Sequence, residues 1–108
     1  MAASDHLRVE IENDPERTVV RLSGELDLAS SPILERELEL AGVDDATMLV
    51  FDLDGLEFLD STGLQVLLST HRQATERGQP FAITRGSPQV QRLLDITRVA
   101  ERLTIVEA

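Results

Sequence analysis

The segment Met48–His71, MLVFDLDGLEFLDSTGLQVLLSTH, contains the pattern that decides the fold. It opens with four apolar residues, 48–51, without the alternation of a half-exposed strand, which indicates a strand buried on both faces, as in a parallel sheet. A loop rich in acidic residues is predicted over 52–60. A helix is predicted next, because apolar or boundary residues recur at i, i+3, i+4 and i+7, namely Leu64, Leu67, Leu68 and His71.

The predicted helix opens on Asp60-Ser61-Thr62-Gly63, directly after the strand and its acidic loop. This order places the Ser61 hydroxyl at the carboxyl end of a central strand and on the first turn of a helix. In open α/β sheets, functional groups gather at that position. The residues around Ser61 are therefore the predicted functional site.

The rest of the chain supplies strands and helices in alternation. Helix starts are marked by serine–proline or by Asp60-Ser61, and helix ends by Gly42 and Gly78. The predicted strands are 7–12, 18–22, 48–51, 81–84 and 103–106. The order β-β-α-β-α-β-α-β predicts an α/β fold with a mixed, mostly parallel sheet of about five strands, whose first two strands are antiparallel.

The composition restricts the partners. A chain of 108 residues is expected to form a single domain, 1–108, with residues 1–5 as a flexible tail. The net charge of −10 and an aromatic content of 3% argue against nucleic acids and anionic membranes. A protein with a basic patch is the expected partner. There is no signal peptide, cysteine or long apolar run, so the protein is expected to be cytoplasmic.

Nucleophilic catalysis by Ser61 is not expected. The segment lacks the first glycine of the Gly-x-Ser-x-Gly elbow. His71 lies ten positions along the same helix, about 15 Å away by helical rise, and His6 is expected in the tail. Ser61 therefore has no base within reach.

A phosphoacceptor aspartate with a divalent metal is the second alternative, with Asp52 or Asp54 as the acceptor. Receiver domains that use this chemistry need a lysine near the last strand, and all ten basic residues here are arginine. The same absence excludes a P-loop. The acidic residues are best interpreted as solvated carboxylates, so neither a metal site nor a cofactor is expected.

Two interpretations of Ser61 remain open from the residues alone. Ser61 or Asp60 can simply be the N-cap of the helix, which these residue types favour. Alternatively, Ser61 is phosphorylated, which adds roughly −1.5 to −2 charges to a surface that already carries Asp54, Glu57 and Asp60. Such a phosphate would act on partner binding without changing the fold.

Four stretches resemble the STAS-domain anti-sigma factor antagonists. Gly24-Glu25-Leu26-Asp27 is similar to the family's Gly-x-Leu-Asp loop, and 58–64 to its Asp-Ser-Ser/Thr-Gly-Leu signature. Residues 86–94 resemble its third helix and 103–106 its last strand. The four stretches occur in the family's order and span nearly the whole chain.

The resemblance implies a non-enzymatic switch protein. Its unphosphorylated form would bind an anti-sigma factor that is also a serine kinase, releasing the sigma factor. The kinase, using ATP, would phosphorylate Ser61 and abolish binding, and a serine phosphatase would reset the switch. By this resemblance, the docking surface of this chain comprises Asp27, Asp60, Ser61, Thr62 and Gly63. Thr62 offers a second hydroxyl.

The resemblance is also compatible with other functions. A constitutive STAS scaffold, or a subunit of a transport or stress-signalling assembly, would need no phosphorylation. A nucleotide-binding protein or small-molecule sensor is a further alternative. The chain also departs from the family at Arg98, where glycine is common. Because arginine tolerates a positive φ poorly, a different turn is expected there.

Overall fold

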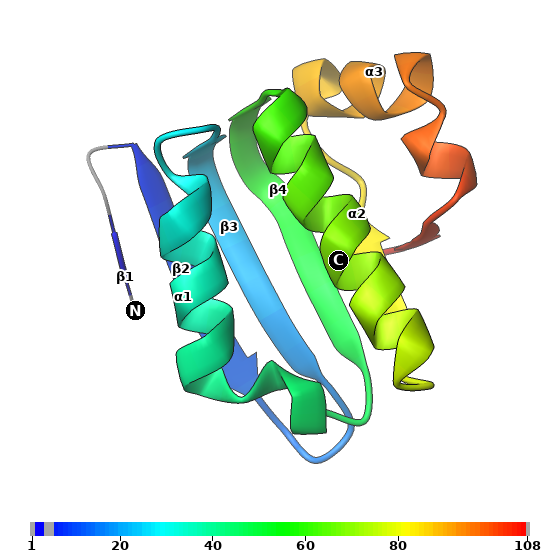
Figure 1. Cartoon of the computed structure of the whole chain (residues 1–108). Coiled ribbons are helices and arrows are strands. Elements are labelled where there is room, and N and C mark those ends of the chain that lie inside the picture. The colour runs from blue at the N-terminus through cyan, green and yellow to red at the C-terminus, as the bar shows by residue number, and fades with distance from the viewer. Residues whose placement is uncertain (1, 4–5, 108) are drawn as a thin grey trace.

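The computed structural model describes residues 2–3 and 6–107, and these form one sheet with helices packed against it (Figure 1). The strands lie in chain order across the sheet. β1 and β2 pair antiparallel, as do β2 and β3, whereas β3 to β6 are parallel. The predicted mixed, mostly parallel sheet is confirmed. The strands are β1 Ala2–Ala3, β2 Leu7–Asn13, β3 Thr18–Leu26, β4 Leu49–Leu59, β5 Phe81–Thr84 and β6 Thr104–Val106.

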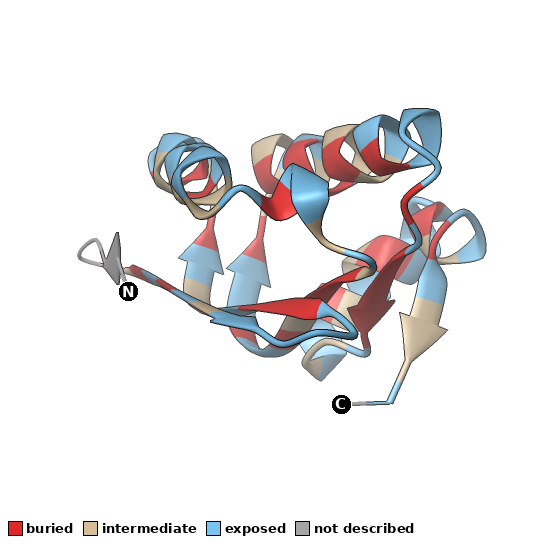
Figure 2. Cartoon of the chain, turned by 90° about the horizontal axis from the view of Figure 1, so that it is seen from below, coloured by how far each residue is buried: buried red, intermediate tan, exposed pale blue. Residues whose placement is uncertain are grey.

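The helices alternate with the parallel strands as predicted. α1 and α2 lie side by side on one face of the sheet (Figures 1 and 2), and α3 packs against β4. Ser31-Pro32 predicts a first helix with Ser31 as N-cap, but α1 begins one residue earlier, with Ser30 as N-cap. Gly42, whose φ of 64° is left-handed, is its C-cap. The helices are α1 Ser31–Ala41, α2 Ser61–Glu76 and α3 Pro88–Ile96, with 3₁₀ turns η1 Val43–Asp45 and η2 Val99–Glu101.

The amino-terminal segment differs from the tail expected over residues 1–5. Ala2 pairs with Val9 and Ala3 with Arg8, so these two residues form a short antiparallel strand. His6, also expected in the tail, is half-buried and contacts the loop after β3. The backbone groups of β2 offer an open edge, which explains why this segment pairs with it. Residues 1, 4 and 5 lie outside the described part of the chain.

β4 is longer than predicted. Its buried run, 49–51, is followed by more strand up to Leu59, so the expected acidic loop at 52–60 is wrong. β3 likewise extends to Leu26, beyond the predicted 18–22. The two strands support each other, because they pair in parallel from Thr18 and Leu49 to their ends.

Two irregularities in the pairing of β3 with β4 explain why the sequence pattern does not indicate the extension. Arg21 pairs with Asp52 and Ser23 with Gly55, so β4 advances three residues while β3 advances two. A second extra residue of β4 follows Leu56. Each such bulge resets the inward and outward alternation of a strand. As a result, core side chains recur every third residue, at Leu53, Leu56 and Leu59.

The core lies between the sheet and the helices. Phe51 of β4 and Phe81 of β5 pack edge to face, with ring centroids 5.2 Å apart. Leu34 of α1 and Leu67 of α2 are fully buried. The buried face of α2 is centred slightly off the predicted stripe, on Gly63, Val66, Leu67, Thr70 and Ala74. His71 lies at its boundary, half-buried beside Phe81.

The turn after α3 keeps a left-handed residue although that residue is arginine. Arg98 has φ 62° and ψ 16°, and its N–H bonds to the carbonyl of Asp95 at 3.1 Å. The different turn expected from the missing glycine is therefore not found, because the surrounding chain imposes the conformation and Arg98 is exposed. Arg98 bears the backbone strain that glycine would avoid.

Within the described residues, no helix combines the length and the apolar character needed to cross a lipid bilayer.

Candidate functional site

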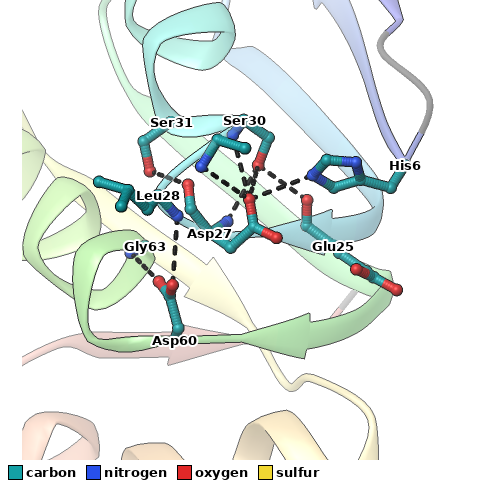
Figure 3. Close-up of polar contacts among 9 residues, drawn as sticks. His6, Glu25, Asp27, Leu28, Ser30, Ser31, Asp60 and Gly63 are labelled. Atoms are coloured by element: carbon teal, nitrogen blue, oxygen red, sulfur yellow. Dashed lines mark hydrogen bonds and ion pairs between the residues drawn. The ribbon is translucent and has the colours of Figure 1, made fainter.

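The site forms where the neighbouring parallel strands β3 and β4 end. The chain leaves β3 through the loop at 27–30, and leaves β4 directly into α2. Because the strands are parallel and adjacent, both exits lie at the same edge of the sheet, and the N–H of Asp60 bonds to the carbonyl of Leu26 at 3.3 Å. Figure 3 shows the loop and the helix start facing each other.

Asp60 joins the two exits with its two carboxylate oxygens. Oδ1 accepts the N–H of Gly63 at 2.9 Å and so caps α2. Oδ2 accepts the N–H of Leu28 at 3.1 Å, in the loop after β3 (Figure 3). The interpretation of Asp60 as an N-cap is confirmed, and the second bond gives this residue a further role in holding the loop against the helix.

Asp27 organises the loop from the other side. Its Oδ1 accepts the N–H groups of Ala29 and Ser30 at 3.0 and 3.1 Å, and the Ser30 hydroxyl at 3.2 Å. The same oxygen lies 3.1 Å from Nε2 of His6. The His6 hydrogen bond is the largest interaction that lowers the pKa of Asp27, and those from Ser30 add to it. Asp27 is thus an ionised, partly exposed group that fixes the loop.

Ser61 occupies the first helical position of α2 and is exposed. Among the described residues, none forms a hydrogen bond with its hydroxyl. Thr62 beside it is partly exposed. The Ser61 hydroxyl is therefore open to solvent at the amino-terminal end of a helix, where unpaired N–H groups and the helix dipole favour an added negative charge.

Gly63 is buried and does not contribute to the exposed surface. A Cβ at this position would lie 2.5 Å from the carbonyl oxygen of Leu26 and 2.6 Å from Cδ1 of Leu59. Glycine is required because α2 begins in close contact with the end of β3. The predicted contact of Gly63 with a partner thus has no support in the structure, and its role is to let Ser61 sit this close to the sheet.

The surface at the end of β4 carries an acidic side chain and two apolar ones lie nearby. Glu57 is exposed, whereas Asp54, further back along β4, lies beside Thr84 of β5. Leu28 is 72% exposed and Phe58 is 47% exposed. Neither apolar residue was predicted to contribute to the site. The predicted loop concealed Phe58, whose outward orientation depends on the bulges in β4.

A family model described as "STAS domain" matches residues 8–108. The chain is 31% identical over 103 residues to an anti-sigma F factor antagonist of Paenibacillus polymyxa, covering 94% of this chain and 88% of that protein. It is 32% identical to the anti-sigma-F factor antagonist RsfB of Mycobacterium tuberculosis, covering 81% and 71%. A crystal structure of an anti-sigma factor antagonist from Mycobacterium paratuberculosis superposes with a TM-score of 0.85 at 27% identity, covering 100% of this chain and 92% of that one.

The matched model spans nearly the whole chain, and the fold agrees with that of a solved relative. The chain belongs to the STAS domain family.

Proposed function

We propose that this protein is an anti-sigma factor antagonist whose binding is switched off by phosphorylation of Ser61. In its unphosphorylated form it binds an anti-sigma factor and thereby releases the sigma factor. The observation that carries the proposal is the exposed, solvent-facing hydroxyl of Ser61 on the first turn of α2, in a chain of this family.

The position of Ser61 suits a switch that leaves the fold intact. A phosphate there can accept hydrogen bonds from N–H groups at the start of α2, so the helix tolerates it. The same phosphate adds roughly −1.5 to −2 charges beside Asp60 and Glu57. Any acidic groups of a partner docked over this surface are then repelled more strongly. The partner must also displace water from the phosphate, which costs free energy.

The residues around Ser61 have separate roles in this mechanism. Asp27 and Asp60 hold the loop and the helix start in one arrangement, so that the partner meets a preformed surface. Leu28 and Phe58 offer apolar contact area beside the hydroxyl. Thr62 carries a second hydroxyl next to Ser61, at the edge of this surface. The chain acts in this mechanism as a binding protein.

The partners follow from this mechanism. The anti-sigma factor is itself the serine kinase and binds the ATP, and a serine phosphatase restores the unmodified state. No direct contact with nucleic acid or membrane is needed, and the complex forms in the cytoplasm. The net charge of −10 favours a partner with a basic docking face.

The test is a capture experiment from cytosol of the source organism with the wild type, Ser61→Ala and Ser61→Asp as baits. Captured proteins are identified by mass spectrometry, and the phosphorylated residue of the wild type is mapped. We expect an anti-sigma factor on Ser61→Ala and at least a tenfold smaller amount on Ser61→Asp. Thr75→Asp is the matched control, since it adds the same charge to an exposed position far along α2.

Equal capture by Ser61→Ala and Ser61→Asp would contradict the switch. If the captured protein were then a transport ATPase or a stress-signalling scaffold, and Ser61 were unmodified, the chain would be a constitutive STAS subunit.

A further inference from the structure

Three metal-ligating side chains meet next to the candidate site. His6 precedes β2, Glu25 lies in β3, and Asp27 lies in the loop after it. One nitrogen or oxygen atom of each falls within 4.8 Å of the corresponding atoms of the other two. Figure 3 shows the His6 imidazole directed at the Asp27 carboxylate. No sequence pattern indicates this cluster, since His6 and Asp27 are 21 residues apart.

The backbone holds His6 against β3. Leu7 pairs with Gly24, and the N–H of Glu25 donates to the carbonyl of His6 at 2.7 Å. Gly24 has φ 92°, and a Cβ there would fall 2.0 Å from the carbonyl oxygen of His6. Only glycine permits this close approach. The imidazole is thus positioned by β-pairing and by Gly24, not by a freely moving tail.

The charges in the cluster are not balanced. Glu25 is exposed, and its carboxylate forms no hydrogen bond or ion pair with another residue in the described part of the chain. Asp27 is kept ionised by its hydrogen bonds, which lower its pKa. The cluster thus combines two carboxylates with one imidazole. A divalent cation would neutralise the carboxylates.

We propose that His6, Glu25 and Asp27 form a binding site for one Zn²⁺ ion. Imidazole nitrogen and carboxylate oxygen are ligands that this ion accepts in a tetrahedral arrangement, and water completes the fourth position. Two ligand atoms on a tetrahedral ion with bonds of about 2.0–2.1 Å lie about 3.3 Å apart. The observed separation of 3.1 Å between Nε2 of His6 and Oδ1 of Asp27 is close to that value.

Hydrogen bonds from neighbouring residues hold the Asp27 carboxylate in place, as expected for a metal ligand. Ser30 donates both its N–H and its hydroxyl to Asp27, and Ala29 donates its N–H, so the carboxylate is oriented before any ion arrives. Such outer hydrogen bonds are typical of metal ligands. The Glu25 side chain is exposed and can rotate inward to complete the set. The ion would lie between His6 and Asp27, in place of the contact that now joins them.

The test titrates the untagged full chain with ZnCl₂ by isothermal calorimetry at pH 7.5, and follows the two histidines by NMR. We expect one ion per chain and a shift of the His6 ring signals, with His71 unchanged as an internal control. The experiment needs no protein partner, so its outcome is independent of the proposed function.

Glu25→Gln is the decisive variant, because its carboxylate has no hydrogen bond that folding requires within the described residues. It should lower the affinity for Zn²⁺ at least tenfold while leaving the melting temperature unchanged, and His6→Asn should do the same to the affinity. Glu16→Gln, an exposed residue of the β2–β3 turn, is the matched control. Absence of binding, or an affinity that Glu25→Gln and His6→Asn leave unaltered, would overturn the proposal.

Discussion

Two aspartates fix the candidate site at the level of single residues, and they do so differently. Asp60 uses both carboxylate oxygens, one for the start of α2 and one for the N–H of Leu28. Asp27 concentrates its hydrogen bonds on Oδ1, where Ala29, Ser30 and His6 converge. Both residues are therefore structural parts of the surface, besides any contact that they make with a partner.

Asp27 makes the stability of the protein depend on pH. Its folded pKa is lowered, so its charge stabilises the fold above the unfolded value of about 3.9 and this stabilisation is lost as pH falls through the folded pKa. We expect the wild type to exceed Asp27→Asn in free energy of unfolding at pH 5, and the difference to shrink toward pH 2. Urea unfolding measures both, and Asp45→Asn is the control.

A difference between wild type and Asp27→Asn that stayed constant from pH 5 to pH 2 would show that the charge of Asp27 does not stabilise the fold.

At the level of elements, the bulged pairing of β3 with β4 determines where the site lies. The two extra residues of β4 bring core leucines inward at every third position and turn Phe58 outward. They also let both strands run to the same edge of the sheet, where Leu26 receives the N–H of Asp60. The acidic residues of β4 therefore belong to a strand, whose pairing sets the face of the sheet on which each one lies.

The backbone of the turn between α3 and η2 is strained at Arg98, and one substitution should relieve this strain. Arg98 adopts φ 62°, which costs a residue with a side chain about 1–2 kcal/mol more than glycine. We expect Arg98→Gly to raise the free energy of unfolding by up to about 1 kcal/mol, because part of the gain is offset by the flexibility of glycine in the unfolded chain. Chemical denaturation measures the change.

The matched control is Arg92→Gly, within α3, where glycine should instead destabilise by about 0.5–1 kcal/mol. Loss of stability in both variants would mean that the Arg98 side chain stabilises the turn by more than its backbone strain costs.

At the level of the whole molecule, the excess of acidic groups is the dominant electrostatic feature. The chain has 20 acidic and 10 basic residues. The arginine–carboxylate pairs among the described residues are few and exposed to varying degrees: Arg21 with Glu12 and Asp52, Arg72 with Glu76, and Arg77 with Asp44. Most carboxylates thus repel one another across a body of 32 × 31 × 22 Å.

Salt should therefore stabilise the isolated protein. The screening length falls from about 30 Å at 0.01 M to about 10 Å at 0.1 M, which is less than the width of the molecule. We expect the melting temperature to rise by roughly 4 °C over this range, equivalent to about 1 kcal/mol. Differential scanning calorimetry measures it.

The double variant Glu35→Gln, Glu39→Gln removes two exposed charges from α1 and should show a smaller rise. A melting temperature that fell with salt would show that the exposed ion pairs outweigh the general repulsion.

The sequence by itself determined the order of the elements from β2 onward and the starts of α2 and α3. These features are local: β5 is confirmed at 81–84, and Ser87 and Asp60 each cap the helix that follows with their side chains. The same local signals placed Ser61 on the first turn of a helix after a buried strand. The short link between β2 and β3 likewise gave their antiparallel pairing.

Tertiary structure alone decided what surrounds Ser61. The bond from Leu28 to Asp60 spans 32 residues and that from His6 to Asp27 spans 21. The burial of Gly63 and the exposure of Phe58 follow from the register and bulges of β3 and β4. Such contacts depend on how distant strands align, and this alignment is set by packing the whole core at once, which no local pattern of residues specifies.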